Sequence, residues 1–136
     1  MWEFFKSSGS KGAPAAVSPP TPMLDAAAEK LLRERVAALF DALRAGDTAK
    51  CIELSDPQVV KEKGRATAEK FFKGVSGLIR LAKVQPNDRV IKSITPLDGG
   101  KAARVEIELT LNSKKQAPGF EVWGLIDGNW YYRETK

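Results

Sequence analysis

The sequence predicts an α+β fold, with helices in the first half of the folded part and an antiparallel sheet in the second. Between residues 24 and 83 the apolar residues recur at the spacing of an α-helix. From residue 89 onward apolar and polar residues alternate, as in half-buried strands, and Asp-Gly pairs mark the turns between the runs. Helices followed by strands joined through tight turns favour an α+β domain over alternating βα units.

The composition limits both the size and the chemistry of this domain. The chain has 136 residues, 43% hydrophobic and 29% charged, which suits a single core. It contains no histidine and one cysteine, Cys51, which excludes histidine-based triads, histidine-ligated metals and an intrachain disulfide. Cys51 is interpreted as a packing residue, because no histidine can activate its thiol. We expect no cofactor and no metal.

The first 22 residues differ from the rest of the chain. They begin with a cluster of large aromatic side chains, namely Trp2, Phe4 and Phe5. Residues 7–22 consist mostly of Ser, Gly, Ala and Pro, and such a segment buries too little surface to offset its ordering entropy. Residues 23–136 are therefore predicted to form the domain. Because aromatic side chains dominate binding hot spots, we predict that the N-terminal peptide docks on a larger complex.

Three alternatives remain for this peptide, namely contact with a membrane interface, folding back onto its own domain, and an incidental terminus without a binding role. The chain shows no secretory signal, since both a basic start and a continuous apolar run are missing. No apolar run approaches the roughly 20 residues that cross a bilayer. A cytoplasmic protein is therefore expected.

The first helix of the domain is predicted to start at Thr21 and Pro22, because threonine caps helices and proline suits the first helical position. Its apolar stripe consists of Leu32, Val36, Leu39, Phe40 and Leu43. Gly46 is predicted to end this helix in a left-handed conformation. Asp47 then caps a second, short helix, which Asp56-Pro57 stops.

Residues 58–63 are predicted to be a short strand or extended loop, and a third helix follows over residues 67–83. One side of this helix carries Phe71, Phe72, Val75, Leu78, Ile79 and Ala82, whereas the other carries Lys70, Lys73, Arg80 and, at its margin, Lys83. The pattern predicts that both phenylalanines face the core and that the cations form a basic outer face.

The positive charge of the chain is concentrated around this third helix. Residues 61–92 hold nine lysines and arginines against three acids, whereas the whole chain has a net charge of +5. A solvated helix surface is the preferred interpretation, and binding of phosphate or an acidic partner is the alternative. Nucleic-acid recognition usually places aromatic side chains among the cations, so no specific nucleic-acid partner is expected.

The strands are separated by clear turn signals. The predicted strands are residues 90–97, 105–111, 120–126 and 130–133, with turns at 98–100 and 127–129 and a loop at 114–119. In the second strand, the set predicted to face inward is Val105, Ile107, Leu109 and Leu111. Glu106 and Glu108 then lie on the outer face. A reversed strand would place both carboxylates inside as candidate bases, but it would expose four aliphatic side chains.

Three segments carry a resemblance to a known fold. They are Leu39-Phe40-Asp41-Ala42-Leu43-Arg44-Ala45-Gly46-Asp47, then Lys63-Gly64-Arg65-Ala66-Thr67-Ala68-Glu69-Lys70-Phe71-Phe72, and a closing hairpin in which Trp123 and Trp130 flank Asp127-Gly128-Asn129. In this order they resemble the NTF2-like superfamily, which includes SnoaL-like polyketide cyclases and ketosteroid isomerases. The resemblance implies a cone in which about three N-terminal helices pack on a curved antiparallel sheet, with a pocket at the open end.

The resemblance also sets an expectation for function. Catalysts of this superfamily line the pocket with Asp, His, Tyr or Arg, whereas this chain has no histidine and its clearest inward strand set is apolar. The favoured interpretation is a non-catalytic accessory or assembly domain that acts through protein contacts, with the N-terminal peptide docking on a larger complex. The alternative is a small-molecule-binding or cyclase- or isomerase-like protein that uses the cone pocket.

A second interface is expected on the sheet. Trp123 and Leu125 alternate with Phe120, Val122 and Ile126 and are predicted to lie on the convex face, together with Glu106 and Glu108. The resemblance implies that a second copy or another protein covers this face. The alternative is a bulge that turns Trp123 inward.

Overall fold

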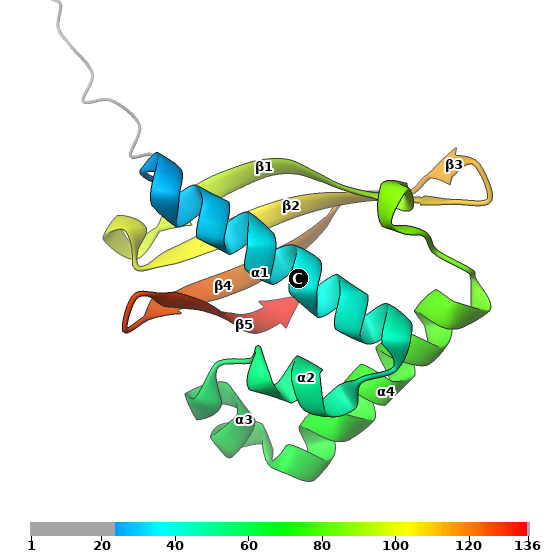
Figure 1. The fold of residues 1–136 in the computed structure, drawn as a ribbon, viewed down its shortest axis with the longest axis horizontal. Helices are drawn as coiled ribbons and strands as arrows, with labels where there is room; N and C mark the ends of the chain where they lie inside the picture. Colours follow the sequence, from blue (N-terminus) through cyan, green and yellow to red (C-terminus); the bar gives the residue numbers. More distant parts are fainter. Residues whose placement is uncertain (1–23, 136) are drawn as a thin grey trace, which may run out of the picture.

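The structure, a computed structural model, describes residues 24–135. In this part of the chain four helices precede an antiparallel sheet, as Figure 1 shows. The helices are α1 (Ala26–Ala45), α2 (Thr48–Glu53), α3 (Pro57–Lys63) and α4 (Arg65–Leu81). The strands are β1 (Arg89–Leu97), β2 (Ala102–Leu111), β3 (Lys114–Lys115), β4 (Gly119–Ile126) and β5 (Asn129–Thr135). The predicted α+β class is confirmed.

The ends of α1 and α2 follow from local side chains. The Asp25 carboxylate accepts a hydrogen bond from the first turn of α1 and caps it. The predicted start at Thr21 and Pro22 lies outside the described residues, and the helix begins later than predicted. Gly46 ends α1 with φ at 73°, and Asp47 caps α2, both as predicted.

The main error of the helix prediction concerns residues 58–63, which form α3 instead of an extended segment. The Asp56 carboxylate accepts a hydrogen bond of 2.9 Å from the backbone N–H of Gln58 and caps the helix. Pro57 occupies the first helical turn, where its missing N–H leaves no hydrogen bond unmade. The same Asp-Pro pair therefore ends one helix and begins the next.

The sheet has the strand order β1-β2-β4-β5, and β3 pairs with β2 beyond this path. All neighbouring strands are antiparallel, and β3 lies within the predicted 114–119 loop. The free edge of β5 is partly covered by the chain between α2 and α3. There the Tyr132 backbone bonds to the backbones of Leu54 and Asp56 at 2.9 and 2.8 Å. This pairing holds the small helices against the sheet.

The register between β2 and β4 decides which side chains face the helices. Val105 pairs with Glu121, and Ala103 pairs with Trp123. Directly paired residues share one face of a sheet. Because Val105 and Ala103 are completely buried, Glu121 and Trp123 also point inward, and Trp123 is itself 0% exposed.

The predicted position of Trp123 and Leu125 on the outer face is therefore wrong. Both residues belong to the core or pack against it. The prediction failed because both alternating sets of β4 contain large apolar residues, so periodicity alone does not choose between them. The prediction of an interface on the outer face of the sheet therefore lacks the two apolar residues on which it rested. The register shift in the β4–β5 pairing lies between Val122 and Trp123, although pairing with β2 already turns Trp123 inward.

The outer face of the central strands is polar. Glu106 accepts a hydrogen bond of 2.9 Å from the Ser93 hydroxyl. Glu108 lies 3.9 Å from the ammonium groups of both Lys92 and Lys115. The two glutamates thus lie on the face away from the core, as the strand alternation predicts.

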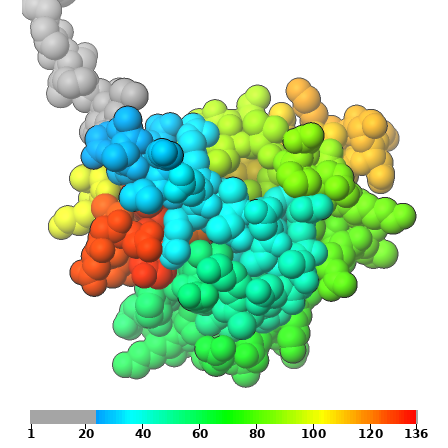
Figure 2. Space-filling view, in the orientation of Figure 1, coloured from blue at the N-terminus to red at the C-terminus, as the bar shows by residue number. Residues whose placement is uncertain are grey.

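The core lies between the inner face of the sheet and α1, which crosses it in Figure 1. The predicted apolar stripe of α1 is buried throughout, and the Trp130 indole donates a hydrogen bond of 3.1 Å to the Ala28 carbonyl. In Figure 2, α1 runs across the visible face, with α2 and α3 below it and α4 along one side.

Two glycines in this fold allow a test of helix stability. Gly74 lies on the exposed side of α4, with nothing within 4 Å of the place that a Cβ would take. Exposed helical glycine is about 1 kcal/mol less favourable than alanine. We therefore expect Gly74→Ala to raise the free energy of unfolding by about 1 kcal/mol in urea denaturation.

Gly46→Ala is the matched control. Its backbone is left-handed, and a Cβ there would lie 2.9 Å from Nη1 of Arg80. This change should lower the free energy of unfolding, by about 1 kcal/mol or more. If alanine destabilised the protein equally at both positions, the result would contradict the placement of Gly74 on the exposed side of α4.

Candidate functional site

A cavity of about 510 Å³ lies between α1, α4 and the inner face of the sheet. We call it the concave pocket. Its apolar walls include Leu39, Phe40 and Leu43 on α1, Phe71, Phe72, Val75 and Ile79 on α4, Ile107 and Leu109 on β2, and Phe120 on β4. A pocket of this volume with mainly apolar walls is typical of small-molecule sites.

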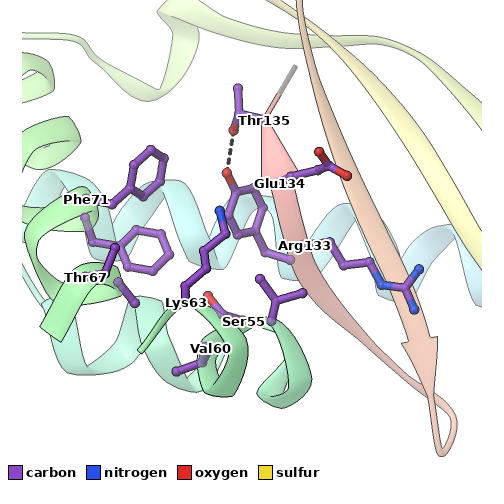
Figure 3. A pocket seen from close by; sticks show the side chains of 12 residues that line it. Ser55, Val60, Lys63, Thr67, Phe71, Arg133, Glu134 and Thr135 are labelled. Atoms are coloured by element: carbon purple, nitrogen blue, oxygen red, sulfur yellow. Dashed lines mark hydrogen bonds between the residues drawn. The ribbon is translucent and has the colours of Figure 1, made fainter. Parts of the chain in front are cut away.

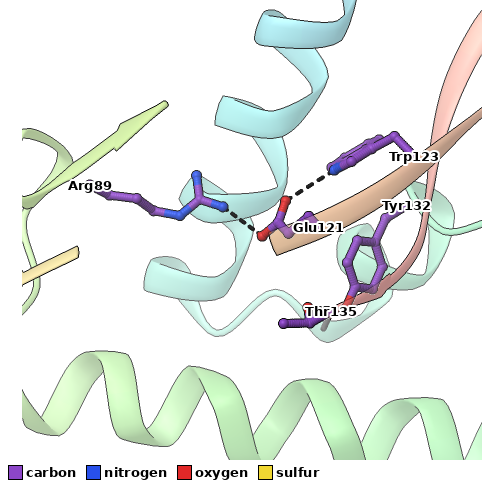
Figure 4. Close-up of polar contacts among 5 residues, drawn as sticks. All are labelled: Arg89, Glu121, Trp123, Tyr132 and Thr135. Carbon is purple, nitrogen blue, oxygen red and sulfur yellow. Dashed lines mark hydrogen bonds and ion pairs between the residues drawn. The ribbon is translucent and has the colours of Figure 1, made fainter. Parts of the chain in front are cut away.

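One ion pair contributes charge to this apolar wall. The Arg89 guanidinium, at the start of β1, lies 2.7 Å from Oε2 of Glu121 on β4, and the two side chains are only 11% and 13% exposed. The Trp123 indole donates a hydrogen bond of 3.0 Å to the other carboxylate oxygen (Figure 4). The guanidinium carbon also lies 4.7 Å from the centre of the Phe40 ring. Both carboxylate oxygens are thus bound, which fixes the orientation of Glu121.

The ion pair contradicts the expectation that the interior lacks polar groups. Sequence reasoning missed Glu121 because it assigned the β4 faces in the reverse sense, and it counted Arg89 only as part of the basic stretch. A usable signal was present, because tryptophan is mostly buried and seldom lies on a solvent-exposed face of a sheet. Since residues two apart in a strand share a face, an inward Trp123 requires an inward Glu121. Nothing in the local sequence marks Arg89 as its partner, since the two residues are 32 positions apart.

Tyr132 forms the wall on the β5 side of the pocket. Its hydroxyl lies 2.5 Å from Oγ1 of Thr135, and its ring packs edge-on against Trp123 with centroids 5.8 Å apart. Burial raises the pKa of Tyr132 to about 12, so the hydroxyl stays protonated at neutral pH. Figure 4 shows the Tyr132–Thr135 pair on the same side of the sheet as the Arg89–Glu121 pair. The pocket therefore holds both charged and neutral hydrogen-bonding groups.

A smaller cavity of about 250 Å³ lies between α3, α4 and the end of β5 (Figure 3). It shares Phe71, Phe72, Tyr132 and Thr135 with the concave pocket. Its rim is polar, with Lys63 from α3 and Arg133 and Glu134 from β5. Arg133 is held 3.0 Å from the buried carboxylate of Asp56. This cavity is therefore a side branch with a charged rim, beside the larger apolar pocket.

The structure places the predicted basic face as expected but corrects the opposite side of the same helix. Lys70, Lys73, Arg80 and Lys83 are all exposed. Phe72 is buried as predicted, whereas Phe71 is 47% and Leu78 is 68% exposed. The reason is that the buried side of α4 is narrow and consists only of Ala68, Phe72 and Ser76. The argument against nucleic-acid binding assumed two buried phenylalanines, and it no longer holds for Phe71.

Other predicted site residues fall into two groups. Trp2, Phe4 and Phe5 lie outside the described residues. Cys51 is 1% exposed, and burial, reinforced by the nearby Asp47 carboxylate, raises the pKa of its thiol to about 11. A buried, protonated thiol fits the interpretation of Cys51 as a packing residue.

Within residues 24–135, no three or more cysteine, aspartate or glutamate side chains come together in a way that could hold a metal ion. None of the helices in the described part of the chain is long and apolar enough to cross a membrane.

The raised pKa of Tyr132 makes stability depend on pH in a predictable direction. The folded protein holds this proton more tightly than the unfolded chain, whose tyrosine pKa is near 10.0. Its contribution is therefore complete below pH 10 and is lost as pH rises towards 12. Between these limits we expect the wild type to lose about 2 kcal/mol more stability than Tyr132→Phe in urea denaturation.

Tyr131→Phe is the matched control, because this neighbouring tyrosine lies on the other face of β5 and is only half-buried. The ultraviolet absorbance of tyrosinate should show that the late titration disappears in Tyr132→Phe alone. Equal pH profiles for the wild type and Tyr132→Phe would contradict the burial of this hydroxyl.

Comparison with known proteins places this geometry in a known fold. No family model and no curated protein matches the sequence. Among solved structures, a designed NTF2-like protein is similar over 79% of this chain and 96% of its own, with 18% identity and a TM-score of 0.56. A Campylobacter jejuni protein described as an NTF2-like transpeptidase is similar over 74% of this chain and 95% of its own, with 17% identity and a TM-score of 0.58. The chain therefore has the NTF2-like fold that its sequence motifs indicate, with helices packed against a curved antiparallel sheet.

Proposed function

We propose that the protein binds a small, largely apolar molecule in the concave pocket, and that Arg89 and Glu121 bind the polar end of that molecule. The observation that carries this proposal is a buried ion pair in the wall of an apolar cavity of about 510 Å³. Of the two functions that the sequence left open, the geometry supports the small-molecule-binding one better.

For the stability of the fold, a buried ion pair is an unfavourable choice in the wall of a pocket. Burying two charges loses hydration energy that their attraction seldom exceeds, and well-packed apolar residues often stabilise a protein more. Glu121 occupies one terminal nitrogen of Arg89, whereas a guanidinium carries five N–H donors. The remaining donors suit a carboxylate, sulfonate or carbonyl oxygen on a ligand whose apolar body fills the pocket.

Binding accounts for the geometry better than catalysis does. Glu121 accepts one hydrogen bond on each carboxylate oxygen, from Arg89 and from Trp123, and these two bonds fix its orientation. In this arrangement Glu121 positions the guanidinium of Arg89, whose free donors are the groups offered to a ligand. Tyr132 keeps its proton at neutral pH and serves as a donor rather than a base. We therefore propose a binding protein without a chemical step.

The accessory role favoured by the sequence stays a prediction. The docking peptide with Trp2, Phe4 and Phe5 lies outside the described residues, and Trp123 and Leu125 face the core instead of a partner. A pull-down with the full chain and with residues 1–22 deleted tests that role. If the full chain and the shortened chain recovered a partner equally, the peptide would not be the docking element.

The pocket is tested with 1-anilinonaphthalene-8-sulfonate, an apolar molecule that carries one anionic group. Val75→Trp adds a large side chain to the α4 wall of the concave pocket and should weaken binding of this fluorescent probe at least about tenfold. Val90→Trp is the matched control, because Val90 is 48% exposed and is not among the residues that line the pocket. Equal probe affinity for both variants, each with native circular dichroism, would contradict the proposed site.

The role of the ion pair is tested by changing the charge of the probe. Arg89→Gln removes the cation, so the anionic probe should bind about tenfold or more weakly. Nile red, which is neutral and apolar, should lose much less affinity because the walls are unchanged. If both dyes lost affinity equally, Arg89 would support only the shape of the pocket.

A further inference from the structure

Within the described residues, helix α4 carries a row of large apolar side chains that are about half exposed or more. Phe71, Leu78 and Leu81 are 47%, 68% and 81% exposed. Phe71 and Leu78 are seven residues apart, so they lie on the same side of the helix, and Leu81 continues the row one turn later. We call these three residues the α4 apolar row. Single exposed leucines are common, but a row of this kind usually marks an interaction site.

Two of the exposed cations of α4 lie beside this row. Lys70 and Lys73 lie next to Leu81 around the helix, whereas Arg80 lies opposite Phe71, on the side towards α1. Within the described residues no salt bridge involves Lys70 or Lys73. The acid on α4, Glu69, lies 3.3 Å from Arg65 and is neutralised by it. Arg80 and Lys83 line a separate depression with Asp41 and Arg44 of α1, and no residue of the row lines it. The surface next to the α4 apolar row is therefore positive on the side of Lys70 and Lys73.

Two glycines on the exposed side of α4 have no structural explanation inside the domain. Nothing lies within 4 Å of the place that a Cβ would take at Gly74 or Gly77, and both are exposed. Each makes the helix less stable than alanine would. They leave a shallow surface between the α4 apolar row and the cations, across which a broad partner can approach closely.

We propose that α4 docks on an anionic lipid surface. The α4 apolar row would enter the boundary between headgroups and acyl chains, and Lys70 and Lys73 beside it would face the lipid phosphates. An amphipathic helix with apolar residues on one side and lysines beside them is the usual form of such an interfacial element. Basic residues next to the membrane strengthen binding to anionic lipid.

The charges and the shape of the surface favour lipid over other occupants. A second copy of the chain would bring two basic surfaces together. Residues 1–23 contain one acid, Glu3, and two lysines, so this segment supplies no complementary negative charge. Leu78 and Leu81 protrude from the convex surface of helix α4. A deformable acyl layer can cover protruding side chains, whereas a protein partner would need matching pockets.

The docking proposal does not depend on the concave pocket, because Leu78 and Leu81 are not among the residues that line it. These two positions therefore test lipid binding without changing the ligand site. Phe71 does line the pocket and is left intact.

The experiment measures co-sedimentation of the full chain with vesicles of phosphatidylcholine alone and of phosphatidylcholine mixed with phosphatidylglycerol. We expect binding to the mixed vesicles that weakens as salt is added. The double variant Leu78→Gln/Leu81→Gln should reduce the affinity at least about tenfold. Leu31→Gln is the matched control, because Leu31 is 42% exposed on α1, and it should leave the affinity unchanged.

A second pair of variants tests the charges. Lys70→Gln/Lys73→Gln should reduce the affinity for mixed vesicles about tenfold or more at low salt. Lys30→Gln/Lys101→Gln removes two exposed lysines from other elements and should have a much smaller effect.

Three results would overturn the proposal. The first is no binding to either vesicle. The second is unchanged binding of Leu78→Gln/Leu81→Gln. This result includes the case in which binding is abolished only when Trp2, Phe4 and Phe5 are replaced by alanine. The third is tighter binding to polyglutamate or to a single-stranded oligonucleotide than to mixed vesicles, which would assign the surface to an acidic protein or a nucleic acid.

Discussion

The pairing of β2 with β4 is the constraint on which the site depends. With Val105 opposite Glu121, the carboxylate and the Trp123 indole lie next to each other on the inner face. A slip by one residue would move every side chain of β4 to the other face. In the observed register the buried carboxylate requires a cation and the buried indole requires an acceptor. Arg89 meets the first requirement and Glu121 meets the second.

The sequence predicts those elements whose signal is local. Gly46 ends α1 and Asp47 begins α2, because a left-handed glycine and a capping carboxylate act within one turn. The inward set of β2 was also predictable, since its alternating positions differ completely in polarity. Residues 58–63 were not, because an Asp-Pro pair is compatible with both the end and the start of a helix. The faces of β4 required its pairing partner, which lies outside its own pattern.

Helix α4 shows a further limit of periodicity. A helical wheel separates its apolar arc from its basic arc, but it does not show how much of the apolar arc other elements cover. In the structure Phe72 is buried and its neighbour Phe71 is half exposed. The difference depends on where α1 and α2 contact the helix, which is a property of tertiary packing. The apolar arc of α4 contains both residues that line the concave pocket and residues of the α4 apolar row, and the helical wheel does not separate the two groups.

The position of α4 links the two proposals. One side of the helix, with Val75 and Ile79, borders the concave pocket, and another side, with Leu78 and Leu81, borders solvent. Between these two sides Ala68, Phe72 and Ser76 are buried and hold the helix against the domain. A ligand in the pocket and a lipid surface outside would therefore contact the same helix from different sides. By thermodynamic linkage, any effect of one of them on the affinity for the other is equal in both directions.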